Sequence, residues 1–256
     1  MNSLPLKTIF SMEWLGRLPS KKLAQSVKTL PLLEKKIIAC RDCPRLVDWR
    51  EEVALTKRKA YQDEKYWGKA VPGFGSTKPK LMIVGLAPGA HGANRTGRIF
   101  TGDSSGDWLY GSLHRLGIAK IATSTARDDG QELRETRISM AVRCAPPDNK
   151  PTTQERDQCS PWFLRELELS LPTTRAFVAL GNFAWVALFA ALAELGHPVK
   201  RAKFGHGAEV KYEHNGAKYL IMASFHPSQQ NTFTGKLTKP MLDSVLKKAG
   251  RFSDVL

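Results

Sequence analysis

Residues Ala176–Ala193 read AFVALGNFAWVALFAALA, a stretch that carries no formal charge. Its length alone would suit a transmembrane helix. Gly181 and Asn182, however, divide it into a β-rich half and an Ala/Leu-rich half, a pattern typical of a buried strand, a turn and a buried helix. We therefore predict a strand over 176–180, a helix over 183–195 and no membrane span.

Three further apolar runs have the character of strands buried on both faces. They are Lys80–Val84, Ile138–Val142 and Tyr219–Ala223. The helical candidates that alternate with them are Lys21–Ala39, Gly106–Leu116, Thr153–Leu169 and Pro240–Lys248. Such alternation predicts an α/β fold, a three-layer α/β/α sandwich with a central, mostly parallel four-stranded sheet.

The Asn215-Gly216 pair lies between two β-like runs in Ala208–Ala223, and this pair is a strong hairpin signal. A small antiparallel edge should therefore accompany the parallel strands. We predict one domain over residues 1–256, with an N-terminal helical segment that has no strand of its own.

The chain is strongly basic, with 39 Lys and Arg against 24 Asp and Glu, a net charge of +15 and a pI of about 9.8. This excess favours a polyanionic partner, nucleic acid first, over a protein that is merely basic. The first 22 residues lack the pattern of a secretory signal, so we expect a cytoplasmic protein.

All four cysteines fit one arrangement, in which Cys40 and Cys43 form a close pair and Cys144 and Cys159 follow much later. Paired thiolates at such spacing are typical of a tetrahedral metal ion or a cuboidal cluster. Disulfides are the alternative, but a cytosolic chain is kept reduced. The long loop between the last two cysteines favours a cluster over zinc, and the spacing leaves both open. Either group would join the N-terminal segment to the sheet.

Ligands in open α/β sheets bind beyond the carboxyl ends of the strands, where the most informative loops are expected. The glycine-rich loop Gly85–Asp103 permits a close approach of its backbone to a ligand, yet it matches neither a Walker A loop nor GxGxxG. Within it, Asp103 could simply cap the next helix, and Phe100 could belong to the core. After the last strand, His226 and Pro227 begin a polar projection suited to a ligand contact.

These loops resemble the motifs of the uracil-DNA glycosylase superfamily, and within it the family five (type B) enzymes. The resemblance runs from about Cys40 to Thr238. It rests on GLAPGAHGANRTGRIFTGDSSGDWL, AVRCAPPDNKP, SFHPSQQNTFTGKLT and the cysteine spacing. It implies a [4Fe-4S] cluster on Cys40, Cys43, Cys144 and Cys159. It also implies hydrolysis of the N-glycosidic bond of a deaminated base that has been extruded from DNA, which leaves an abasic site.

The resemblance assigns roles residue by residue. His226 would donate a hydrogen bond near O2 of uracil, and Phe100 would stack on the flipped base. Asp103 would hold the attacking water or stabilise the sugar cation. The remaining residues expected around the base are Gly85, Ala87, which replaces a polar catalytic residue of other branches, His91, Asn94 and Ser228, which begins a projection toward the DNA through Gly235.

One position departs from the pattern of those enzymes. An asparagine commonly lies four residues before the third cysteine, where this chain has Met140. Methionine lacks the paired donor and acceptor that would select uracil, so hypoxanthine becomes a second expected substrate. The alternatives are a lesion-DNA-binding protein without catalysis and a zinc-containing RNA-binding module. The expected partner is double-stranded DNA, with single-stranded DNA left open, and we expect a monomer that associates with the nucleoid.

Overall fold

Six strands form one mixed sheet in the computed structural model, which describes residues 19–256. The strand order is β1-β3-β2-β4-β6-β5. The strands are β1 Phe74–Gly75, β2 Leu81–Gly85, β3 Thr136–Met140, β4 Ala176–Leu180, β5 Glu209–His214 and β6 Ala217–Ser224. The four central strands are parallel to one another, whereas β1 and β5 pair antiparallel to β3 and β6.

The predicted four-stranded sheet is therefore correct for the parallel centre, but it lacks the edge strands β1 and β5. Strand β1 contributes only two residues, too short a run to show a pattern in the sequence. Strand β5 is the antiparallel edge that Asn215-Gly216 predicted, and both turn residues have positive φ, 50° and 74°. A turn of this kind matches the twist of the two strands that it joins.

The helices follow most of the predicted ranges and add some that were not predicted. The α-helices are α2 Pro19–Ser26, α3 Leu30–Ile38, α4 Pro44–Thr56, α5 Ala93–Thr96, α6 Ser104–Arg115, α7 Thr153–Ser170, α8 Asn182–Glu194, α9 Gln229–Phe233 and α10 Lys239–Phe252. Two short 3-10 helices are η2 Lys59–Tyr61 and η3 Pro147–Asn149. The range Lys21–Ala39 is two helices rather than one, and α4 was missed although Pro44 lies at its first turn, a favoured position for proline.

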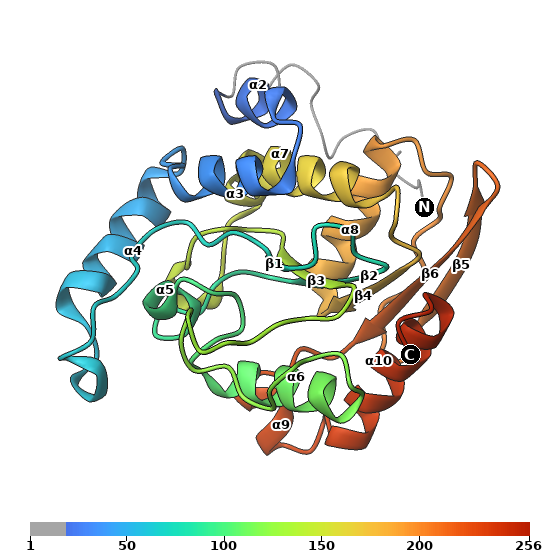
Figure 1. Ribbon diagram of the computed structural model, residues 1–256. Helices are drawn as coiled ribbons and strands as arrows, with labels where there is room; N and C mark the ends of the chain where they lie inside the picture. Colours follow the sequence, from blue (N-terminus) through green and yellow to red (C-terminus); the bar gives the residue numbers. More distant parts are fainter. Residues whose placement is uncertain (1–18) are drawn as a thin grey trace, which may run out of the picture.

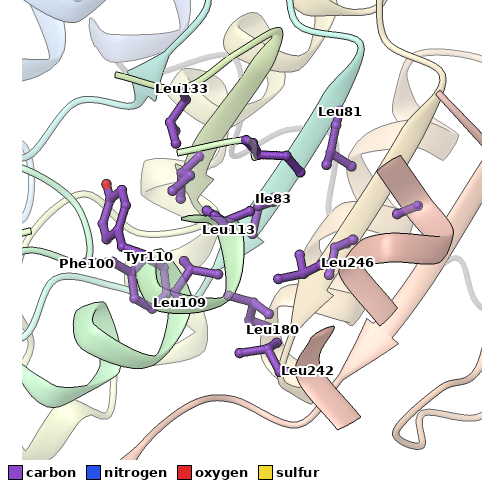
Figure 2. Close-up of a cluster of buried hydrophobic side chains, with 14 of the residues drawn as sticks. Leu81, Ile83, Phe100, Leu109, Tyr110, Leu113, Leu133, Leu180, Leu242 and Leu246 are labelled. Carbon is purple, nitrogen blue, oxygen red and sulfur yellow. The ribbon is translucent and has the colours of Figure 1, made fainter. Parts of the chain in front are cut away.

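Each central strand buries side chains on both faces of the sheet, which gives the predicted three layers (Figure 1). Leu81 and Ile83 of β2 face α6 and α10, whereas Met82 and Val84 face α7 and α8. Figure 2 shows the first of these interfaces, with side chains from the strands packed against leucines from the two helices. None of the helices within residues 19–256 is long and apolar enough to cross a membrane.

The N-terminal helices form a further group on the outer side of α7 (Figure 1). Apolar side chains of α2, α3 and α4 pack there around Trp162 of α7 and the four cysteines. The extent of the domain stays a prediction, because residues 1–18, which include most of the segment judged to lack a signal, lie outside the described residues.

A buried charged group joins β3 to α7 beneath these helices. Glu166 is fully buried and accepts hydrogen bonds from Arg137, Arg143 and Ser139. Burial alone would raise the pKa of Glu166, but the guanidinium groups of Arg143 and Arg137 lower it to about 2. The carboxylate therefore stays charged and balances two buried cations.

Replacing Glu166 with Gln should destabilise the fold strongly, because buried Arg143 would lose its carboxylate partner and Arg137 would keep only Glu34. We expect the free energy of unfolding to fall by about 3–5 kcal/mol. Urea denaturation measures it, with Glu168→Gln as the control because Glu168 makes an exposed ion pair with Arg165 worth under about 1 kcal/mol. Equal losses in the two variants would contradict a structural role for the buried group.

Candidate active site

Four connections leave the carboxyl ends of the parallel strands at one edge of the sheet. Residues 86–103 follow β2, 141–152 follow β3, Gly181 follows β4 and 225–238 follow β6. The sequence predicted these loops to bind a ligand. The sheet topology brings them to a single edge, as in other open α/β sheets.

Phe100 and His226, which come from the first and last of these loops, are in contact. Their ring centroids are 5.7 Å apart and the rings are tilted by 31°. The ring of Phe100 also lies against Gly85 at the end of β2, where an added Cβ would come within 3.0 Å of two ring carbons. Glycine at position 85 therefore leaves the space that the phenyl ring occupies.

Phe100 is largely buried, at 6% exposure, and has the unusual φ of 50°. A non-glycine residue in this region is strained, which is common where a side chain must be aimed at a site. A base sandwiched between Phe100 and His226 would need a separation of about 7 Å, twice the ~3.5 Å contact distance of carbon atoms. A base that stacks on Phe100 must therefore use a part of the ring that His226 does not cover.

His226 is held by contacts to its backbone. Its carbonyl accepts a hydrogen bond from Asn231 Nδ2 at 2.8 Å, and the end of β4 lies beside it at Gly181. Burial lowers the pKa of His226 to about 4. The imidazole is therefore neutral near pH 7 and carries a single N–H donor.

Asp103 is the N-cap of α6, as its helix-cap interpretation predicted. Its Oδ1 accepts a hydrogen bond from the backbone N–H of Gly106 at 3.0 Å. Its Oδ2 faces the turn before α5, because a Cβ added at Gly92 would come within 1.9 Å of this oxygen. Burial raises the pKa of Asp103 against the opposing effect of the N–H groups of Gly106 and Ser105. The carboxylate is thus more basic than an exposed one, which suits the capture of a proton.

His91 and Asn94, predicted to line the pocket, make specific contacts within the protein. His91 Nδ1 and the hydroxyl of Tyr66 are 3.1 Å apart, and burial, followed by Arg58 and Arg95, lowers the pKa of His91. Asn94 is fully buried, and its Nδ2 donates to the carbonyl of Arg50 at 3.1 Å. This geometry favours a positioning role for Asn94, while its contact with a base stays a prediction.

The remaining predicted residues belong to different parts of the structure. Met140, at 2% exposure, belongs to the same buried apolar cluster as Phe100. Ala87 packs instead against the cluster that contains the cysteines. Ser228 is the N-cap of α9, and its side chain makes no capping hydrogen bond. Phe233 at the end of α9 is 78% exposed.

The four cysteines meet at one cavity, which they line together with Trp162 and Arg143. Cys40 and Cys43 lie between α3 and α4, Cys144 follows β3, and Cys159 lies in α7. All four are free thiols, so the disulfide alternative does not hold. Burial, and then Cys144 and Cys40, raise the pKa of Cys43 to about 12. Binding of a metal group would therefore release protons from these thiols.

Among residues 19–256, no three His, Cys, Asp or Glu side chains lie close enough to hold one metal ion. The cavity nevertheless has a polar wall of N–H donors. Arg50 Nη1 donates to Cys144 Sγ at 2.8 Å, and the backbone N–H of Arg143 donates to Cys159 Sγ at 3.3 Å. The Nε and Nη1 atoms of Arg143 and the Nε1 atom of Trp162 are buried and have no partner in the described part of the chain.

Arg50 and Tyr66 were not among the predicted site residues. Arg50 had a signal, because it shares the inward face of α4 with Leu46, Val47 and Val53, where an arginine needs a buried partner. Tyr66 had none, since nothing in the sequence shows that its segment reaches His91.

Comparison of the sequence with known proteins identifies its family. Residues 72–250 match the model of the uracil DNA glycosylase superfamily. The chain belongs to the uracil-DNA glycosylase superfamily. Similar members include a type-5 uracil-DNA glycosylase of Mycobacterium bovis, 48% identical over 91% of this chain and 85% of that protein. Those of Thermus thermophilus and Pyrobaculum aerophilum are 48% and 44% identical, over 85% and 84% of this chain and 95% and 89% of theirs.

The two interpretations of Asp103 can be separated by Asp103→Asn, because asparagine caps helices as well as aspartate but cannot accept a proton from water. We expect stability within about 1 kcal/mol of the parent and base release from uracil-containing DNA slowed at least about 100-fold. Asp107→Asn, an exposed carboxylate of the same helix turn, is the control and should keep its rate. Near-normal turnover by Asp103→Asn would show that Asp103 serves only as the N-cap of α6.

Proposed function

We propose that this member of the superfamily is a monofunctional DNA N-glycosylase that hydrolyses the bond between uracil and deoxyribose and leaves an abasic site. The observation that carries the proposal is the convergence of Asp103, Phe100 and His226 at the carboxyl edge of the sheet. The type-5 relatives, which are named uracil-DNA glycosylases, support the same chemistry.

Asp103 acts on the sugar side of the bond in this proposal. Its Oδ1 is occupied by the N-terminus of α6, which leaves Oδ2 to hold a water or to stabilise positive charge on the deoxyribose. Glycosidic cleavage passes through an oxocarbenium-like state, so a fixed carboxylate lowers its energy. The raised pKa makes this oxygen a better proton acceptor.

His226 acts on the base side. Negative charge develops on the departing uracil, and the neutral imidazole can donate its N–H to O2 without carrying a charge in the ground state. Phe100 supports the base with the free part of its ring. Because Ala87 has no polar group, these side chains and the surrounding backbone must supply the catalysis.

The cysteine cavity would hold a [4Fe-4S] cluster on Cys40, Cys43, Cys144 and Cys159. Its unpartnered N–H donors suit a group with net negative charge. The long interval between Cys144 and Cys159 favours a cluster over zinc, because zinc sites usually use two closely spaced ligand pairs. When bound, the cluster would cross-link α3, α4, α7 and the loop after β3, and it takes no part in the cleavage.

The DNA partner would be bound by the net charge of +15 and by the segment Ser228–Gly235. The exposed Phe233 is suited to contact an opened base stack, as apolar wedges do in other DNA-bending proteins. We propose duplex DNA with a flipped uracil as the substrate, single-stranded DNA as a further one, and action as a monomer at the nucleoid.

Hypoxanthine is the second candidate base. The observation that favours it is the burial of Met140 in the same apolar cluster as Phe100, because methionine is an apolar and adaptable side chain. A methionine side chain has no paired donor and acceptor that would select the hydrogen-bonding edge of uracil.

Incubation of the protein with duplexes that contain uracil, hypoxanthine or no lesion, followed by alkaline cleavage of abasic sites, tests both activities. We expect strand breaks at uracil and slower breaks at hypoxanthine. Tight binding to lesion DNA without breaks at either base would show a lesion-binding protein without glycosylase activity. Breaks at uracil alone would show that hypoxanthine is not a substrate.

The pH dependence of the single-turnover rate tests the neutral state of His226. Because its pKa is near 4, His226 should give the rate no inflection near the ordinary histidine value of ~6.5. Any inflection between pH 8 and pH 6 that persists in His226→Gln belongs to another group, such as Asp103, whose pKa is raised by burial. An inflection near 6.5 that is lost in His226→Gln would mean that the imidazole titrates as an exposed group.

A further inference from the structure

Arg50 makes hydrogen bonds both to the cysteines and to the loop predicted to bind the base. Its side chain is 1% exposed on the inward face of α4. Nη1 donates to Cys144 Sγ at 2.8 Å, and Nη2 donates to the carbonyl of Cys40 at 3.1 Å. One guanidinium thus joins the two distant halves of the cysteine set.

The backbone of Arg50 reaches the other way. Its carbonyl accepts a hydrogen bond from Nδ2 of Asn94, which is fully buried in α5. The carbonyl of Asn94 in turn accepts from the N–H of Gly68 at 3.0 Å. Helix α5 has four residues, too few to be stable without such external contacts.

The position of α5 matters for Asp103. Gly92 is the N-cap of α5, and Asp103 Oδ2 fills the space where a side chain at Gly92 would lie. A shift of α5 would therefore change the surroundings of this carboxylate. Hydrogen bonds therefore join Cys144 to Arg50 and Arg50 to Asn94, and the backbone of α5 joins Asn94 to Gly92, which lies against Asp103.

We propose that Arg50 and Asn94 are positioning residues that couple the cysteine-bound cluster to the catalytic carboxylate of Asp103. The proposal rests on the cluster and the glycosylase activity proposed above. Arg50 holds the cluster end through Cys144 and Cys40, and Asn94 transmits the position of α4 to the loop that borders Asp103.

The charge of Arg50 gives this role a signature apart from activity. A guanidinium that donates to a cluster sulfur stabilises the reduced, more negative state and raises the reduction potential. Loss of this donor should shift the potential to more negative values. A residue that only filled space would leave the potential unchanged.

The first experiment compares Arg50→Met and Arg50→Lys with the parent and with Arg41→Met, the removal of an exposed arginine beside Cys40. Anaerobically purified protein is assayed for iron, visible absorbance and reduction potential. We expect Arg50→Met to lower the potential and to lose its cluster about 10-fold faster in air, as for other outer-shell partners. Arg50→Lys should have a smaller effect, because lysine keeps the charge without bridging both groups, and Arg41→Met should resemble the parent.

The second experiment uses Asn94→Ala, which touches no cysteine. We expect it to keep the parent's iron content and potential and to release uracil about 10-fold more slowly, the usual loss for an outer-shell partner. Because both residues act through one path, the rate effects of Asn94→Ala and Arg50→Lys should be less than additive in the double variant. If Arg50→Met does not fold, the comparison of Asn94→Ala, Arg50→Lys and the double variant still tests the coupling.

The outcomes separate this proposal from those on which it rests. If the parent protein contains no iron, the proposed cluster is wrong, and if it releases no uracil, the proposed activity is wrong. If the parent is brown and active, and the Arg50 variants keep its reduction potential and cluster lifetime, the proposed role of Arg50 is wrong. Strictly additive rate losses, or an unchanged rate in Asn94→Ala, would overturn the coupling.

Discussion

The capping of α6 by Asp103 is the interaction on which the proposed site depends. One carboxylate oxygen closes the first turn of the helix, and the other is enclosed by the glycine turn at Gly92. The helix terminus stabilises the negative charge, while burial raises the pKa. A cap and a catalytic base are therefore compatible here, because the helix uses one oxygen and leaves the second for chemistry.

The rest of the edge is arranged around this carboxylate. Phe100, three residues earlier in the same loop, has a strained backbone and contacts His226 from the last loop. Behind the loop, α5 depends on contacts to α4, and α4 borders the cysteine cavity. A cluster in this cavity would thus act as scaffold for the pocket as well as for the N-terminal helices.

Much of the fold could be predicted because its signals are local. The break at Gly181 and Asn182 separates β4 from α8, and Asn215-Gly216 marks the β5–β6 hairpin. Strand β1 was not predicted because two residues show no periodicity. Helix α4 was not predicted because an arginine interrupts its apolar face. The meeting of Phe100 with His226 was expected only from the resemblance to a family, whereas the spacing of the cysteines already predicted that Cys40 and Cys144 share one site. The Arg50–Asn94 contact needed the structure, because it joins segments whose sequences carry no shared pattern.

A crystal structure of the protein with an abasic DNA strand and free uracil would test the proposed roles of Asp103, Phe100 and His226. We expect the uracil to lie against the ring of Phe100, with a nitrogen of His226 within hydrogen-bond distance of O2. Asp103 Oδ2 should face the sugar or a water beside it, and Met140 should form the floor. A uracil bound away from the carboxyl edge of the sheet, or a carboxylate of Asp103 turned entirely into its helix, would contradict these roles.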